Sequence, residues 1–183
     1  MPLLPFATCG DIPTPDAGCS FLYDTGQAIL AAALTGLEPF IPPDSCGQSF
    51  DAYVSMGPPV AEFCDALSIH LLSYGPTGQR VFPSECADGA YPQQVAKWQV
   101  QLWENCYPGA TTEGGPSVEL LDHVNEHVYA HGIAMYVAVV SGWADKSIVL
   151  PPQVTSLTFG DLTPLGPQGL AVGWKFDVAA VVG

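Results

Sequence analysis

Three histidines spaced one helical turn apart are the sharpest candidates for chemistry in this sequence. His123, His127 and His131 recur every four residues, so on a helix they would lie on roughly one face. Two histidines one turn apart can bind a zinc ion, and a neighbouring carboxylate, Asp122 or Glu126, could then act as a base. A metal-dependent enzyme is therefore one hypothesis for this chain.

The same histidines have a simpler structural interpretation. The order H-V-N-E-H differs from H-E-x-x-H, and His123 and His131 would stand about 12 Å apart along a helix, too far to share one ion. A third ligand would have to come from elsewhere, and the remaining histidine is His70. We therefore expect a solvated or subunit-facing row of histidines with no bound metal.

Motifs for nucleophilic catalysis and phosphate binding are poorly matched. Ser141-Gly142-Trp143 lacks the G-x-S-x-G pattern of a nucleophile elbow. The segment 166–169 (Gly-Pro-Gln-Gly) is followed by neither the lysine nor the helix of a phosphate-binding loop, and we interpret it as a hairpin turn. The scattered Asp11, Asp16 and Asp24 are expected at the solvated surface. The sequence thus predicts no catalytic residue, no cofactor-binding residue and no enzyme.

The charge balance excludes two classes of partner. The chain has 183 residues, 18 acidic and 4 basic, for a formal net charge of −14. Binding to a nucleic-acid backbone by counterion release needs clustered lysine and arginine, and so does attraction to anionic lipid. A chain this acidic should repel DNA. The basic residues are Arg80, Lys97, Lys146 and Lys175.

Neither export nor membrane insertion is expected. The N-terminal residues 1–6 lack a basic region and contain two prolines, which argues against a signal peptide. The richest apolar run, Ile133 to Trp143, is shorter than the roughly 20 residues that a membrane span needs.

The cysteines leave two alternatives open. No pair has C-x-x-C spacing, which argues against a zinc ribbon or a thioredoxin-type site. Without an export signal we favour reduced thiols that pack as small core residues. The alternative is a secreted binding domain with three disulfides of undetermined pairing. The cysteines are Cys9, Cys19, Cys46, Cys64, Cys86 and Cys106.

Two segments have the periodicity of helices. The first should run from about Ser20 to Thr35 and stop at Gly36. The second should run from about Pro116 to Val140, with Gly132 permitting a kink or a close approach to a sheet. The expected apolar stripes are Leu22, Ile29, Ala33 and Leu37 in the first helix, and Leu121, Val124, Val128, Met135 and Val139 in the second.

Alternating segments predict strands. Residues 66–74 and 95–104 should form a hairpin, and 154–159 should pair with 172–182 in a closing hairpin. A further edge strand is possible over 49–54, among prolines. The expected inward side chains are Leu67, Ile69 and Leu71, then Ala96, Trp98, Val100 and Leu102, then Val172, Trp174, Phe176, Val178, Ala180 and Val182. The expected outward ones are Ser68 and His70, then Lys97, Gln99 and Gln101, then Gly173, Lys175 and Asp177.

The four tryptophans are the large anchors of this pattern. Trp98 and Trp174 fall on strand faces that should be buried, and Trp174 should pack with Phe176 against the second helix. Trp103 breaks its strand's alternation, so it is either an outward-facing interface residue or part of a second core layer under the helix. Trp143 ends the apolar run of the second helix.

These elements together predict an α+β fold, an antiparallel sheet of three to five strands packed by two helices. Residues 1–19 form an arm, and residues 20–183 form one domain. The order is helix, two strands, long helix, two strands, with no internal repeat.

Several segments resemble the tail terminator proteins of long-tailed bacteriophages, especially those of actinobacterial phages. The resemblance covers about residues 20–182 and rests on order and spacing, because each segment alone is weak. The segments are 64–71 (CDALSIHL), 81–83 (VFP) with Cys86, 96–102 (AKWQVQL) closing at Cys106, 163–169 (TPLGPQG) and 172–178 (VGWKFDV).

The resemblance implies a structural virion protein with no catalytic or cofactor residues to carry over. Relatives of this kind form a hexameric ring that ends tail-tube growth and joins the tail to the head. The expected partners are further copies of the chain, the tail tube protein and a head-proximal neck protein, with assembly in the host cytoplasm. An acidic ring would let DNA pass without sticking. Other neck proteins, adaptors or stoppers, are the alternative.

Overall fold

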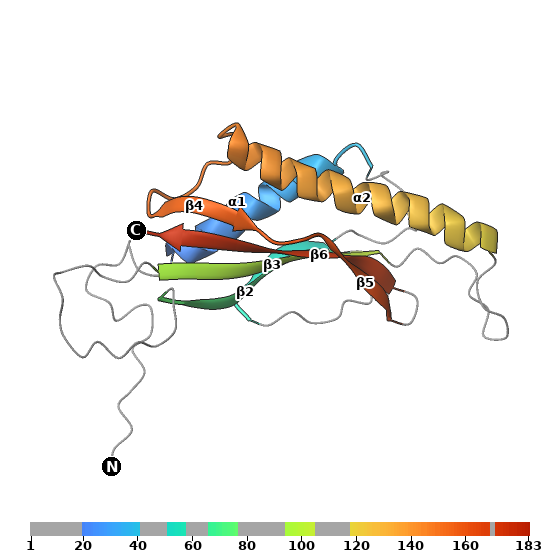
Figure 1. Cartoon of the computed structure of the whole chain (residues 1–183), viewed down its shortest axis with the longest axis horizontal. Helices are drawn as coiled ribbons and strands as arrows, with labels where there is room; N and C mark the ends of the chain where they lie inside the picture. Colours follow the sequence, from blue (N-terminus) through green and yellow to red (C-terminus); the bar gives the residue numbers. More distant parts are fainter. Residues whose placement is uncertain (1–19, 41–50, 58–65, 77–93, 105–117, 169–170) are drawn as a thin grey trace, which may run out of the picture.

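The computed structural model describes residues 20–40, 51–57, 66–76, 94–104, 118–168 and 171–183. Figure 1 shows both helices on the same side of a twisted sheet. In chain order the elements are α1 (Ser20–Leu37), β1 (Asp51–Ser55), β2 (Ala66–Pro76), β3 (Gln94–Glu104), α2 (Val118–Ala144), β4 (Val154–Phe159), β5 (Thr163–Gln168) and β6 (Ala171–Val182).

The α+β class and the two-helix cover are confirmed, but the sheet has six strands and is mixed. Its order is β1-β2-β3-β6-β4, with β5 also pairing with β6. The expected antiparallel pairings of β2 with β3 and of β4 with β6 are present. The expected edge strand is β1, and it runs parallel to β2. Parallel pairing joins segments that no hairpin connects, so alternation along the chain could not reveal it.

The turn-rich segment after β4 corrects a second expectation. Residues 163–168 form strand β5, in which Thr163 pairs with Lys175 and Leu165 with Gly173. Prolines are tolerated there because an edge strand leaves one row of N–H groups unpaired. Of the expected turn at 166–169, residues 166–168 therefore lie in a strand, and residue 169 lies outside the described residues.

Helix α1 packs as its stripe predicts, and two glycines set its distance from its neighbours. A Cβ on Gly26 would stand 2.7 Å from a methyl carbon of Val54 and 2.9 Å from the Trp98 ring. Gly36 does not stop the helix, which continues to Leu37. A Cβ on Gly36 would stand 2.6 Å from the Ala134 carbonyl oxygen, so this glycine permits the close crossing with α2. The stripe residues Leu22, Ile29, Ala33 and Leu37 are all buried.

Helix α2 lies against β6, and Gly132 makes the contact possible. A Cβ on Gly132 would overlap the Trp174 ring, which confirms the expected close approach of helix and sheet. The indole N–H of Trp174 donates to the Val128 carbonyl oxygen at 2.7 Å. The Phe176 ring meets Tyr136 edge-on with centroids 5.0 Å apart. Of the expected stripe, Val128, Met135 and Val139 are buried, and the side chains of Leu121 and Val124 lie outside the described set.

The core lies between the helices and one face of the sheet. Opposite residues of antiparallel neighbours share a face, so the register places Val100 beside both Ile69 and Phe176 on the helix side. Every one of these three side chains is buried. The other face carries the intervening residues and is covered by neither α1 nor α2; we call it the open sheet face.

Candidate assembly surfaces

In the described part of the chain, the histidines of α2 do not form a three-histidine site. The rings of His127 and His131 are 6.2 Å apart on α2. Nδ1 of His131 instead lies within hydrogen-bonding distance of the Glu104 carboxylate, at 2.8 Å, and the centres of the His131 and Phe40 rings are 5.2 Å apart. This pair ties α2 to the end of β3. The side chain of His123 lies outside the described set.

His70 stands on the opposite side of the sheet from α2. It pairs with Gln99 in the β2–β3 register and therefore lies on the open sheet face. Its Nε2 is 2.9 Å from the Ser68 hydroxyl oxygen, and its ring meets Tyr53 edge-on. The sheet separates it from His127 and His131, so it does not supply their missing ligand.

Other sequence candidates are similarly accounted for within the described ranges. The hydroxyl of Ser141 donates to the Val137 carbonyl oxygen at 2.6 Å inside α2, where no nucleophile elbow exists. Among the side chains described, no cluster of three or more His, Cys, Asp or Glu residues could hold a metal ion. Residues 1–19, which were expected to form an arm and include Asp11 and Asp16, lie outside the described residues, as do all six cysteines.

The open sheet face carries a ladder of hydrogen bonds that links four side chains. The Trp103 indole N–H donates to Oε1 of Gln101 at 2.9 Å, and the Gln101 amide donates to Oε1 of Gln99 at 2.7 Å. The Gln99 amide then donates to the Asp177 carboxylate on β6 at 2.9 Å. All three donors point the same way, toward an exposed carboxylate. We call this set the glutamine ladder.

The ladder was not predicted, although its elements were. Alternation placed Lys97, Gln99 and Gln101 outward on β3 and Asp177 outward on β6, and the register sets Gln99 opposite Asp177. Ser68, His70 and Gln101 were expected to face outward; they do leave the helix side, yet they are buried. Alternation reports which face a residue takes, and burial depends on what lies near that face.

Trp103 takes a position that neither sequence-based alternative described. It points away from the helices, opposite Gly173 of β6, and it is buried. Both expected alternatives are therefore wrong: Trp103 is not exposed, and the polar layer in which it is buried lies on the face away from the helices. Trp143, by contrast, packs at the margin of the main core.

Helix α2 presents a row of exposed apolar side chains on its outer side. Tyr129, Ile133 and Val137 follow one another at intervals of four residues, with exposed fractions of 57%, 37% and 53%. The Tyr129 ring meets Trp174 edge-on at 5.8 Å, which fixes its direction. We call these three residues the α2 stripe. A contiguous apolar row on an acidic protein is a candidate interaction surface.

Charges divide unevenly between the two sides of the molecule. In the described helical layer, including the turn after α2, five exposed carboxylates accompany one lysine, Lys146. The open sheet face holds Lys97 and Lys175 beside Asp177, and Asp51 of the edge strand β1 shares this face, so its described charges balance. Half of the chain's basic residues thus lie on this face. The carboxylates of the helical layer are Asp24, Glu38, Asp122, Glu126 and Asp145.

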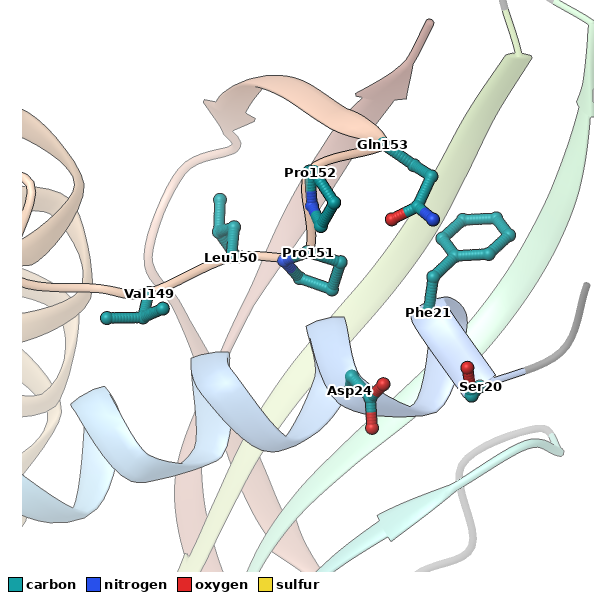
Figure 2. A pocket seen from close by; sticks show the side chains of 8 residues that line it. All are labelled: Ser20, Phe21, Asp24, Val149, Leu150, Pro151, Pro152 and Gln153. Carbon is teal, nitrogen blue, oxygen red and sulfur yellow. The ribbon is translucent and has the colours of Figure 1, made fainter. Parts of the chain in front are cut away.

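A shallow groove runs between the start of α1 and the segment before β4. It has a volume of about 370 Å³. Figure 2 shows Pro151 and Pro152 along one wall, with the Phe21 ring and the Gln153 amide facing one another at one end. Oε1 of Gln153 is buried without a hydrogen-bond partner in the described parts of the chain. The groove contains no pair of side chains arranged for catalysis. It is lined by Ser20, Phe21, Asp24, Val149, Leu150, Pro151, Pro152 and Gln153.

Comparisons with known proteins gave a structural likeness to a virion chain. No protein-family profile and no curated protein matches the sequence. Among solved structures, a chain described as "Virion of native gene transfer agent (GTA) particle" aligns with a TM-score of 0.38 and 13% identity. The alignment covers 87% of this chain and 98% of that one. Neither described helix is long and apolar enough to cross a membrane.

Proposed function

We propose that this chain is a structural protein of a phage-like virion, a tail terminator that assembles into a ring of six copies. The observation that carries the proposal is where the terminator-like segments fall. Residues 66–71, 96–102 and 172–178 lie on β2, β3 and β6, three consecutive strands of one sheet. Segments that resemble a family at scattered places in the sequence thus form one contiguous unit.

A role in assembly also fits the state of the polar side chains that could have served chemistry. His131 is held by Glu104, the Ser141 hydroxyl by a backbone carbonyl, and His70 lies across the sheet from α2. The α2 stripe provides an exposed apolar surface for association. We accordingly propose a binding and structural role without turnover, with 20–183 as the ring-forming domain and 1–19 as an arm.

The net charge suggests what the ring does for DNA. Six copies at −14 each would carry about −84 formal charges. A channel lined by a share of these carboxylates would repel phosphate and let the genome pass without binding. The purified protein should therefore leave a DNA fragment unretarded in a gel even at low salt. Tight, salt-sensitive binding would contradict this part of the proposal.

The proposed partners are the tail tube protein on one side of the ring and a head-proximal neck protein on the other, in a particle assembled in the host cytoplasm. An adaptor or stopper at another level of the neck is the alternative. The two are separated by the partner: a terminator caps purified tail tubes, and an adaptor or stopper binds the head-side connector instead.

The direct test is the mass and shape of the purified full chain. Mass photometry and negative-stain electron microscopy should show rings of six 19.2-kDa copies, alone or once tail tube protein is added. Rings should appear at the ends of tubes and stop their growth. A chain that stays monomeric under both conditions, and leaves tube length unchanged, would overturn the proposal.

A further inference from the structure

We propose that the α2 stripe is a docking site for a helix of another protein, one that carries apolar side chains along one face and lysine or arginine at one end of that face. The inference goes beyond the proposed ring, because it assigns the stripe to a different protein and not to a second copy. Figure 1 shows α1 and the sheet below α2, with no described element above it.

The α2 stripe faces away from the protein's own core. Successive helical residues turn by about 100°, so Val137 points roughly opposite the buried Val139 and Met135. Tyr129 and Ile133 lie on the same outward side. Folding therefore leaves much of the apolar area of these three side chains in water, and a partner that covers them would gain the free energy of its burial.

The spacing of the stripe favours a helix as the element that covers it. Side chains four residues apart form a ridge on a helix surface, and such ridges pack into the grooves of a second helix. Tyr129, Ile133 and Val137 form one such ridge. At the helical rise per residue the ridge is about 12 Å long, the length of two turns.

The acidic side chains that continue the stripe set the charge of the partner. Glu126 lies three residues before Tyr129 and Asp122 lies seven before it, so both carboxylates fall on the outward side of α2, and both are exposed. No lysine or arginine lies between 118 and 144. A helix with basic side chains at this end and apolar ones over the stripe would match the surface in both respects.

A second copy of the chain offers no such surface in the part that the structure describes. Two α2 helices packed together would bring like charges together. Each described lysine stands near an aspartate, so no described surface is basic, and the fourth basic residue, Arg80, lies outside the described residues. The partner is therefore a different protein. The neighbouring charges are Lys97 and Lys175 with Asp177 and Asp51 on the open sheet face, and Lys146 beside Asp145 in the turn after α2.

The test uses the full chain and a synthetic helix as the probe. The probe is a fluorescently labelled peptide with leucines along one face and lysines beside them, and fluorescence anisotropy measures its dissociation constant. One control peptide has the same residues in scrambled order, and a second has glutamate in place of lysine. The basic amphipathic peptide should bind at least tenfold more tightly than either control.

Charge reversal in the full chain locates the binding. E126K should weaken binding of the basic peptide at least fivefold. E38K makes the same change of net charge at an exposed site just after α1 and should leave the affinity near wild type. This pair separates recognition by the stripe from the general attraction of an acidic chain for a cationic peptide. Far-UV circular dichroism checks that every variant is folded.

Apolar docking is tested by V137S against V149S. Serine and valine have similar helix propensities, so V137S should leave α2 intact. It removes an apolar anchor that is 53% exposed and should weaken peptide binding at least fivefold. Val149 is 86% exposed and lies outside α2, so V149S should bind as wild type does.

The outcomes separate this inference from the proposed function. Equal losses for E126K and E38K, or equally tight binding of the scrambled peptide, would overturn the inference. Rings that bind no peptide, and that dissociate in V137S but not in V149S, would show that a second copy covers the stripe; they would overturn the inference and leave the ring standing. A chain that forms no ring but binds the peptide through the stripe would support the inference and reject the proposed function.

Discussion

The two faces of the central sheet differ in chemistry more than in burial. On the helix side, Trp98, Val100 and Phe176 are buried among apolar neighbours. On the other side, Ser68, His70 and Gln101 are also buried, but they are polar: Ser68 and His70 are hydrogen-bonded to each other, and Gln101 is hydrogen-bonded to Gln99 and Trp103. An apolar face gains stability from area removed from water, whereas a buried polar face is stable only while its bonds are made.

The two faces also differ in how far their contacts extend toward the protein surface. The apolar face is complete once the helices cover it. The polar face reaches from buried Trp103 to exposed Asp177, so one continuous network connects the interior to the surface. Replacing a buried member of that network should therefore also alter the hydrogen bond made by the exposed Asp177. Mutations can test whether the two faces of the sheet lose different amounts of unfolding free energy.

The largest loss of unfolding free energy should come from truncating a large side chain in the helix-side core. F176A removes a buried ring that packs edge-on against Tyr136, and we expect a loss of about 3–5 kcal/mol in the free energy of unfolding. Urea unfolding followed by circular dichroism measures it. D177A, the next residue on the opposite face, is the control and should cost far less. Similar losses for the two variants would remove the contrast between the faces.

Breaking the glutamine ladder should have the next largest effect. Q101L keeps the size of the side chain but leaves the buried Trp103 N–H without its acceptor, which should cost about 1–3 kcal/mol in unfolding free energy. Adding W103F removes the stranded donor, so Q101L should cost less in the W103F background. Purely additive costs in this double-mutant cycle would show that the ladder bond contributes no coupling.

The Glu104–His131 contact that joins α2 to the end of β3 should have a smaller effect. E104Q removes the charge facing His131, where the two side chains are 18% and 13% exposed, and we expect at most about 1 kcal/mol. The loss should shrink at high salt if it is electrostatic. Thermal unfolding at low and high salt gives both numbers. A loss as large as that of F176A would mean that this link belongs to the core.

The smallest effect belongs to the turn after α2, which lies on neither face. Bonds from the Ser147 hydroxyl and backbone N–H lower the pKa of Asp145 below its usual 3.8. A lowered folded-state pKa means that this contribution is present above pH 3.8 and is lost as the pH falls through the folded value. S147A should raise the pKa of Asp145 toward its ordinary value in an NMR titration, with little change in unfolding. An unchanged pKa would show that the hydroxyl is not the cause.

The amino-acid sequence by itself determined both helices, most of the strands and the faces they present. The stripe of α1, the buried half of α2 and the alternation of β2, β3 and β6 were all predicted, because periodicity is a local property that each segment carries alone. Gly132 was also recognised as a place where helix and sheet could approach closely, which its contact with Trp174 confirms.

Only the tertiary structure decided what these elements meet. The parallel partner of β2, the conversion of 163–168 from a turn to a strand, and the continuation of α1 through Gly36 all depend on neighbours distant in sequence. The bond between Gln99 and Asp177 spans 78 residues, and that between His131 and Glu104 spans 27. Hydrogen bonds of this kind follow from strand register and helix placement, which no local pattern encodes, and so the open sheet face emerged only when the chain was folded.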